Sequence, residues 1–223
     1  MRDKFEADVD AVLKGVGDGM TLLVGGFGGS GVPYHLIHAV AERGLHDLTL
    51  VANNCGTGEH GLSELFGAGC VRRVVASFPT QDGNNRFLDA YHRGEVEVEL
   101  VPQGTLVERL HAGASGLGGV LTPTGVGTIL AAGRQLMNLN GRTYVLELPM
   151  RGDVALVHAS VADHAGNLRF RRSARNFNRL MAMAADLTIV EADKVVETGC
   201  LDPDDIHTAG VFVDWVTYSG DPV

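Results

Sequence analysis

Three glycines, Gly26, Gly28 and Gly31, lie between an apolar run and an amphipathic segment. The run 20–24 predicts a buried strand, and the apolar positions within 36–41 predict one face of a helix. A glycine-rich turn between a strand and a helix lets the backbone approach a ligand closely, because glycine adopts conformations that other residues avoid. The spacing Gly-x-Gly-x-x-Gly is that of dinucleotide-binding proteins, which hold a pyrophosphate at this turn.

Two features weigh against a dinucleotide site. A ribose-binding acid is expected at the end of the second strand, but Asp47 precedes that strand and the neutral Asn53 and Asn54 follow it. Pro33 favours the first turn of a helix, which places the helix start near Val32 rather than at the second glycine. A nicotinamide-binding module remains an alternative.

Three amide side chains follow predicted strands. Asn53 and Asn54 end the strand 48–52, and Gln103 ends the period-two segment 95–101. Open α/β sheets bind ligands at the carboxyl ends of their parallel strands, so we expect these amides to face a ligand. Amides also bond loop backbones readily, and capping of the following turns is the alternative role of Asn53 and Gln103.

The alternation of apolar runs and amphipathic segments predicts a three-layer α/β/α fold, with an open, mostly parallel sheet covered by helices on both faces. The segment 95–101 alternates with one polar face, which predicts a strand towards an edge. The segment 169–185 is basic and amphipathic, and 187–190 is expected to be the last core strand. The tail after Pro203 is expected to expose Phe212, Val213 and Trp215. The predicted strands are 20–24, 48–52, 74–78, 95–101, 144–148, 154–159 and 187–190.

Composition limits the partners. A net charge of -9 over 223 residues disfavours nucleic acid and anionic membranes, because neither would meet a basic surface. No apolar run reaches the roughly 20 residues needed to cross a bilayer, and the N-terminus has no targeting pattern. The 3 cysteines form neither a disulfide framework nor a zinc motif, so we expect a cytoplasmic protein with one domain over residues 1–223 and no metal.

The glycine segment belongs to a longer pattern, Asp18-Gly19-x-x-Leu22-Leu23-Val24-Gly25-Gly26-Phe27-x-x-x-Gly31-x-Pro33. This pattern resembles the A subunit, or N-terminal half, of family I coenzyme A transferases. Further segments that are similar to the family follow in the same order. They are Asn53-Asn54, 97–105 with Glu108-Arg109, Pro123-Thr124-Gly125, 173–177 and Asp202-Pro203. The resemblance covers nearly the whole chain.

The resemblance implies a reaction in which CoA moves between two carboxylic acids through a glutamyl thioester. It places the nucleophilic glutamate in a Glu-Asn-Gly segment of a B subunit, and this chain contains no such segment. The implied partners are therefore that B subunit, in an A2B2 heterotetramer, and the substrates, acyl-CoA thioesters and carboxylic acids, with no bound cofactor. The resemblance implies substrate contacts for Asn53, Asn54, Gly26, Phe27, Gly28, Gly31 and Gly125, with Gln103 as the donor to the carbonyl oxygen.

The acid substrate stays open. The segment 141–147 resembles the 3-oxoadipate group, whereas Val126 resembles short-chain, acetate-type members. Succinyl-CoA is the expected donor, and 3-oxoadipate or acetoacetate the expected acceptor. An acetate or short-chain fatty acid transferase is an alternative, as is a non-catalytic acyl-CoA sensor on the same fold.

Other polar residues have ordinary explanations. Glu97 and Glu99 share a face of one strand, and a solvated face explains them better than an acid–base pair. The arginines within 169–175 are suited to a CoA phosphate or a dicarboxylate, although surface pairing is their usual role. Cys55 is expected to be a small buried residue. Phe27 is either a core aromatic or part of the site.

Overall fold

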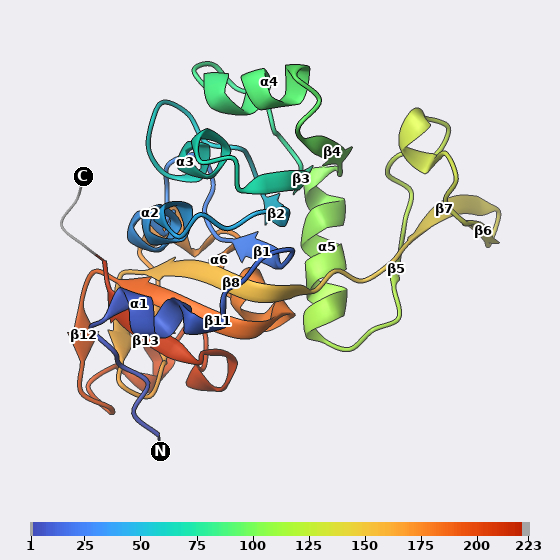
Figure 1. Ribbon diagram of the computed structural model, residues 1–223. Helices are drawn as coiled ribbons and strands as arrows, with labels where there is room; N and C mark the ends of the chain where they lie inside the picture. Colours follow the sequence, from blue (N-terminus) through green and yellow to red (C-terminus); the bar gives the residue numbers. More distant parts are fainter. Residues whose placement is uncertain (1, 220–223) are drawn as a thin grey trace.

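The computed structural model describes residues 2–219, and its centre is a parallel sheet of 7 strands. Their order is β13-β11-β8-β1-β2-β3-β4, and every neighbouring pair is parallel (Figure 1). The predicted edge position of the strand near 95–101 is confirmed, because β4 pairs on one side only. The strands are β1 Thr21–Val24, β2 Leu48–Ala52, β3 Val71–Ala76, β4 Glu97–Leu100, β8 Gly152–Ala159, β11 Ala185–Ala192 and β13 Trp215–Tyr218.

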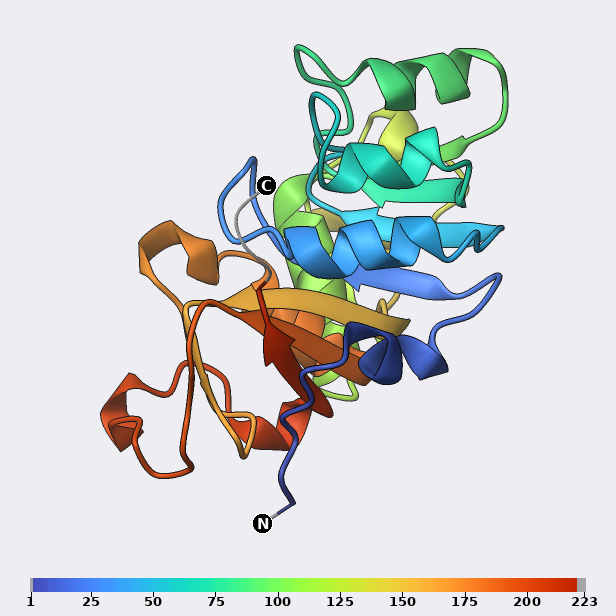
Figure 2. The same ribbon diagram turned by 60° about the vertical axis from the view of Figure 1, so that its left-hand side comes forward.

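Helices cover both faces of this sheet, as predicted. Successive side chains of a strand point to opposite faces, so Leu22 and Val24 pack in one core and Leu23 in the other. Helices α1 to α4 cover the first core, and α5 and α6 cover the second (Figures 1 and 2). The helices are α1 Val9–Val12, α2 Tyr34–Glu42, α3 Leu62–Gly67, α4 Asn85–His92, α5 Gln103–Ala114 and α6 Asn178–Ala184, with 3-10 turns η1 Leu13–Gly15, η2 Ile129–Ala131, η3 Arg172–Arg175, η4 Pro203–Asp205 and η5 Gly210–Phe212.

The strand order reverses between β1 and β8. From β1 the chain builds outward through β2, β3 and β4, and it then returns to place β8, β11 and β13 on the other side. Such a reversal leaves a crevice at the carboxyl ends of the two central strands, where open α/β sheets bind their ligands. The glycine loop directly follows β1, so it lies at this switch point.

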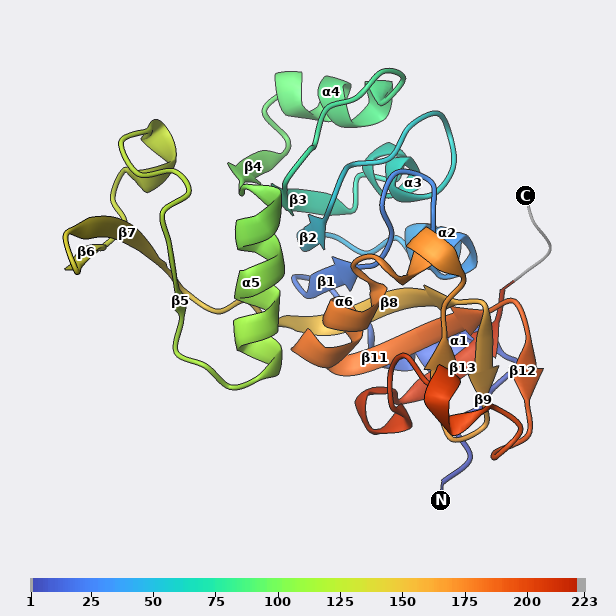
Figure 3. The same ribbon diagram turned by 180° about the vertical axis from the view of Figure 1, so that it is seen from behind.

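Two smaller sheets extend the main body. β9 Val161–Asp163 pairs with β10 Leu168–Arg169 and β12 Val195–Val196. β5 Val120–Thr122, β6 Leu136–Leu139 and β7 Arg142–Glu147 form an antiparallel sheet, which projects from the body beside α5 (Figures 1 and 3). We call residues 118–148 the arm. The arm contains the segment Pro123-Thr124-Gly125, and its β7 is the strand expected at 144–148, here outside the main sheet.

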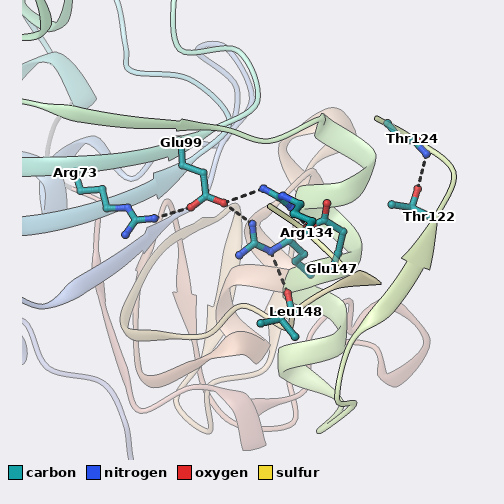
Figure 4. Close-up of polar contacts among 8 residues, drawn as sticks. Arg73, Glu99, Thr122, Thr124, Arg134, Glu147 and Leu148 are labelled. Atoms are coloured by element: carbon teal, nitrogen blue, oxygen red, sulfur yellow. Dashed lines mark hydrogen bonds and ion pairs between the residues drawn. The ribbon is translucent and has the colours of Figure 1, made fainter. Parts of the chain in front are cut away.

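An ionic cluster ties the arm to the edge of the main sheet (Figure 4). Glu99 accepts hydrogen bonds from Arg73 at 2.7 Å and from Arg109 at 2.8 Å. Arg134 of the arm lies 3.4 Å from the same carboxylate and also pairs with the buried Glu147. Burial raises the pKa of Glu99, but the Arg109 and Arg73 guanidinium groups outweigh it, and the net pKa is below its ordinary value. The prediction of a solvated face is therefore wrong for Glu99.

The C-terminal prediction is also wrong. β13 pairs with β11 as an additional core strand, so 187–190 does not lie in the last strand of the sheet. Val213 is buried, and Trp215 packs against the first core, whereas Phe212 is exposed as predicted. The basic segment 169–185 is divided among β10, η3 and α6 rather than forming one amphipathic element. Across residues 2–219, no helix combines the length and apolar character needed to cross a membrane.

Candidate active site

The loop that follows β1 makes a tight turn. The N–H of Gly25 donates to the carbonyl of Leu156 on β8 at 2.9 Å, so the loop leaves the sheet at the switch point. Phe27 and Ser30 exchange two backbone hydrogen bonds of 3.0 Å. Between them, Gly28 has a φ of 56°, in the left-handed region that favours glycine. The turn therefore lies at the edge of the sheet where a ligand would bind.

Helix α2 starts after the glycine motif. Its first residue is Tyr34, with Pro33 as the N-cap, and Gly31 precedes both. The buried carboxyl group of Glu191 on β11 accepts a hydrogen bond of 2.9 Å from the N–H of Leu36. A dinucleotide pyrophosphate would need the N–H groups of this first helical turn itself. The helix end is already occupied by a protein carboxyl group, and this removes the basis for a nicotinamide site.

Asn178 on α6 holds the glycine loop from the second core. Its Oδ1 accepts from the N–H of His158 at 3.0 Å, and its Nδ2 donates to the carbonyls of Gly31 at 2.8 Å and Ala174 at 2.9 Å. The side chain is fully buried. A Cβ added at Gly25 would lie 1.8 Å from this Oδ1. The close approach of the Asn178 amide therefore requires glycine at position 25.

Asn176 holds the other side of the loop. Its Oδ1 accepts from the N–H of Gly26 at 3.2 Å, and its Nδ2 donates to the carbonyl of Ser30 at 2.9 Å. Neither Asn176 nor Asn178 is among the predicted site residues. These contacts join residues about 150 positions apart, and such a separation leaves no periodic signal in a sequence. In the sequence, Asn176 is indicated only by the resemblance of the segment 173–177 to the family, and Asn178 lies just outside that segment.

Asn53 and Asn54 lie at the carboxyl end of β2, as predicted, and both are buried. Asn53 Nδ2 donates to Ser77 Oγ at 2.8 Å and so joins the ends of β2 and β3. Asn54 Oδ1 accepts from the N–H of Gly56 at 2.8 Å, as in an Asx turn. The Asn53 side chain therefore bonds another side chain rather than capping the turn that follows it, and only Asn54 supports a turn. These bonds fix both amides in place at the site edge.

Gln103 opens a helix rather than ending a strand. β4 ends at Leu100, and Gln103 is the first residue of α5, after Pro102. Its side chain is exposed, and no side chain caps this helix end. The first N–H groups of a helix lack intrahelical partners and carry a partial positive charge. The Gln103 amide and this helix end together can stabilise a developing oxyanion.

A hollow of about 240 Å³ adjoins the glycine loop. Gly28 and Gly29 form one side, and Tyr34 and Asn54 contribute to the rest together with the segment 56–60. Among the described residues that line it, none is lysine or arginine. The amide of Asn54, the Tyr34 hydroxyl and the glycine backbone supply neutral hydrogen-bonding groups, and Glu59 is the one carboxylate among the described lining residues.

Of the remaining predicted contacts, Phe27 lies on the glycine loop, whereas Gly125 does not. Phe27 is 47 % exposed at the tip of the glycine turn, which excludes its alternative role as a core aromatic. Gly125 lies on the arm, where its carbonyl accepts from Thr128, and so this chain alone does not bring it to the glycine loop. Cys55 is buried, as predicted. Over residues 2–219, no group of three potential metal ligands is found.

Glu191 is buried beside the site and is not paired with a basic residue of the described chain. Burial raises its pKa to about 8, against the opposing effect of the hydrogen bond from Leu36. Asp193 adds a further negative charge nearby. His158 faces Glu191 across the β8–β11 pairing, and His35 lies at the start of α2.

We expect the Glu191 carboxyl group to make the free energy of unfolding decrease as the pH rises. A pKa raised from 4.5 to about 8 means that the folded chain binds more protons than the unfolded chain between those values. The free energy of unfolding should therefore decrease as pH rises through this window, by up to about 1.4 kcal/mol per pH unit. Urea unfolding at several pH values, for the wild-type chain and Glu191→Gln, isolates this effect, because the histidines are common to both. Equal slopes would contradict the assignment.

Comparison with known proteins identifies the chain. The coenzyme A transferase family model matches residues 6–219. The chain belongs to the coenzyme A transferase family. It is 47 % identical over 216 residues to the A subunit of 3-oxoadipate CoA-transferase from Pseudomonas putida, covering 97 % of this chain and 94 % of the relative. It is also 43 % identical to the A subunit of succinyl-CoA:3-ketoacid coenzyme A transferase from Helicobacter pylori strain 26695, covering 98 % and 93 %.

A third relative is the alpha subunit of acetate CoA-transferase from Escherichia coli K12, at 49 % identity over 91 % of each chain. These relatives confirm that this transferase chain is an A subunit, in line with the sequence pattern, and an A subunit implies a partner B subunit. The fold agrees with that of an acyl-CoA transferase from E. coli O157:H7, with a TM-score of 0.86 at 21 % identity. The match covers 100 % of this transferase chain but 48 % of that protein, so the chain spans about half of its length.

Proposed function

We propose that this subunit forms half of the active site of an enzyme that moves CoA from succinyl-CoA to a 3-oxo acid, either 3-oxoadipate or acetoacetate. The strongest support is the near full-length similarity to A subunits with these activities. The placement of the glycine loop and Gln103 at the carboxyl edge of the sheet agrees with it. The chain acts as one domain within an A2B2 assembly.

The reaction proceeds through a glutamate of the B subunit. The glutamate carboxylate attacks the thioester carbonyl and expels CoA as a thiolate. The product on the enzyme is an acyl-glutamyl anhydride. The thiolate then attacks the glutamyl carbonyl, which releases the acid and leaves a glutamyl-CoA thioester. The acceptor acid reverses these steps and departs as the new acyl-CoA. Such a relay replaces one difficult exchange by easier ones.

This chain supplies the donors for the relay. Each attack places negative charge on a carbonyl oxygen. A fixed hydrogen-bond donor stabilises this charged transition state more than it stabilises the neutral carbonyl of the substrate. Gln103 and the N–H groups at the start of α5 take this role. The backbone around Gly26, Phe27, Gly28 and Gly31 shapes the approach to the glutamate, and Asn53 and Asn54 fix the acid in the adjoining hollow.

The acceptor acid is tested by assaying the purified A–B complex with succinyl-CoA and each candidate acid. We expect 3-oxoadipate or acetoacetate to have a far larger kcat/KM than acetate. The 49 % identity to the alpha chain of an acetate CoA-transferase favours acetate as the second candidate. A preference for acetate would replace the 3-oxo acid in the proposal, and transfer to none of the three acids would reject it.

A further inference from the structure

The carboxyl group of Glu191 acts as a cap that helix α2 lacks in its own sequence. The N-cap residue of α2 is Pro33, whose side chain makes no capping hydrogen bond. An N-cap side chain ordinarily accepts a hydrogen bond from the N–H of the second or third residue of the helix. The third residue of α2 is Leu36, and its N–H donates to Glu191 Oε2, which belongs to a residue 155 positions away, at 2.9 Å. Glu191 therefore caps α2 from a strand of the main sheet.

Glu191 lies beneath α2, on the face of the sheet that α1 to α4 cover. It is 2 % exposed, and Ile189, which shares its face of β11, belongs to the first core. The neighbours in register with Glu191 are His158 on β8 and Thr217 on β13, and Asp193 follows on the same strand. These neighbours include no lysine or arginine, so the first turn of α2 is the main polar partner of this carboxyl group.

The turn that Glu191 caps also forms part of the hollow beside the glycine loop. Val32 and Tyr34 both line this hollow. A Cβ added at Gly26 would lie 2.7 Å from Val32 Cγ2, and a Cβ added at Gly61 would lie 2.7 Å from Tyr34 Cε1. Both side chains therefore fit closely against neighbouring backbone, one on the glycine loop and the other before α3. A movement of the first turn of α2 would change the shape of the hollow.

We propose that Glu191 is a positioning residue of the candidate active site. Its carboxyl group holds the first turn of α2, and that turn places Val32 and Tyr34 against the acid in the hollow. Glu191 is not among the described residues that line the hollow, so it acts through α2 and does not touch the acid. This role rests on the proposed acid transfer, and it adds a determinant of acid binding that lies beneath the site.

Three substitutions test this role in the intact A–B complex. Glu191→Ala removes the acceptor, so KM for the acceptor acid should rise by about tenfold, the usual effect of leaving a buried N–H unpaired, and kcat should change little. Glu191→Gln keeps an acceptor oxygen and resembles the uncharged carboxyl group that a pKa of about 8 implies at pH 7, so KM should stay near the wild-type value. Ile189→Val is the matched control on the same face of β11. It lowers stability without removing the cap, so KM should not change.

Hydrogen exchange of the segment 33–37, measured by mass spectrometry, follows the cap without any substrate. The first N–H groups of a helix exchange readily when they have no partner. The Leu36 amide should therefore be protected in the wild-type and Glu191→Gln complexes, and it should exchange faster in Glu191→Ala.

Two results would overturn the role. The first is an unchanged KM in Glu191→Ala, with only a lower apparent kcat or melting temperature, which would make the carboxyl group purely structural. The second is a KM in Glu191→Gln as high as in Glu191→Ala. If Glu191→Ala fails to assemble with the B subunit, fast exchange of the Leu36 amide in the wild-type complex would itself show that the cap does not hold the turn. A wild-type complex that transfers CoA to no acid would reject the proposed function and leave the exchange results intact.

Discussion

Replacing Gln103 by alanine should lower kcat of the A–B complex by about 10²- to 10³-fold. This is the usual effect of removing one donor from an oxyanion site. The loss should fall on kcat, because the donor acts on charge that appears mainly in the transition state. Stopped-flow or steady-state assays with saturating succinyl-CoA and acceptor acid measure this change directly.

Two further substitutions control for structural damage. Gln103→Glu keeps the size of the side chain but places a negative charge near the developing oxyanion, so it should be at least as slow as Gln103→Ala. Glu108→Ala alters an exposed side chain on the same helix and should leave kcat unchanged. Because Gln103 is exposed, the melting temperature should hold in all three variants. Near-normal turnover in Gln103→Ala would remove Gln103 from the catalytic role.

Replacing Gly25 by alanine should abolish activity almost completely. The added methyl group would lie 1.8 Å from Asn178 Oδ1, so either the loop or the amide must move. Asn178 is held by three hydrogen bonds, so its movement would leave buried polar groups without partners, at about 1–3 kcal/mol each. The glycine loop would shift, and we expect kcat/KM to fall by more than 10³-fold.

Gly17→Ala is the matched control outside the site. Gly17 has no positive φ, and the nearest atom to an added Cβ is Met20 Cε at 4.0 Å, an ordinary contact. Its variant should keep most of the activity. The double variant Gly25→Ala with Asn178→Ala should be less impaired than the sum of the two single changes, because the second removes the obstacle to the first. If the activation free-energy changes of the two single variants simply added in the double variant, the contact between position 25 and Asn178 would be contradicted.

The sequence predicts the main body well where the signal is local. Buried strands such as 48–52 have continuous apolar runs, and each is followed by a helical pattern, which defines a parallel sheet. The sequence does not predict β13, because Trp215–Tyr218 has no continuous apolar run and its pairing with β11 is set by tertiary contacts. The sequence also does not predict that the arm lies outside the main sheet, because a strand of an antiparallel pair there has the same local composition as a core strand.

The sequence predicts the glycine loop and the amides as the site, and their catalytic and binding roles stay predictions, but it does not predict the residues that hold them in place. Gly26, Asn53 and Gln103 are visible because each follows or forms a turn in a recognisable strand–helix unit. Asn176 and Asn178 come from the opposite end of the chain and act through tertiary hydrogen bonds. Glu99 looks like a solvated strand residue by alternation alone, and only the folded chain brings Arg109 to it.

The central claim is that this chain completes a thioester site whose nucleophile belongs to the B subunit. Its most direct test is the intact mass of both polypeptides, measured once the A–B complex has reacted with succinyl-CoA in the absence of acceptor acid. We predict a CoA adduct on the B subunit that accumulates rapidly only when this chain is present, and no adduct on this chain. An adduct on this chain, or an equally fast adduct on an isolated B subunit, would contradict the claim.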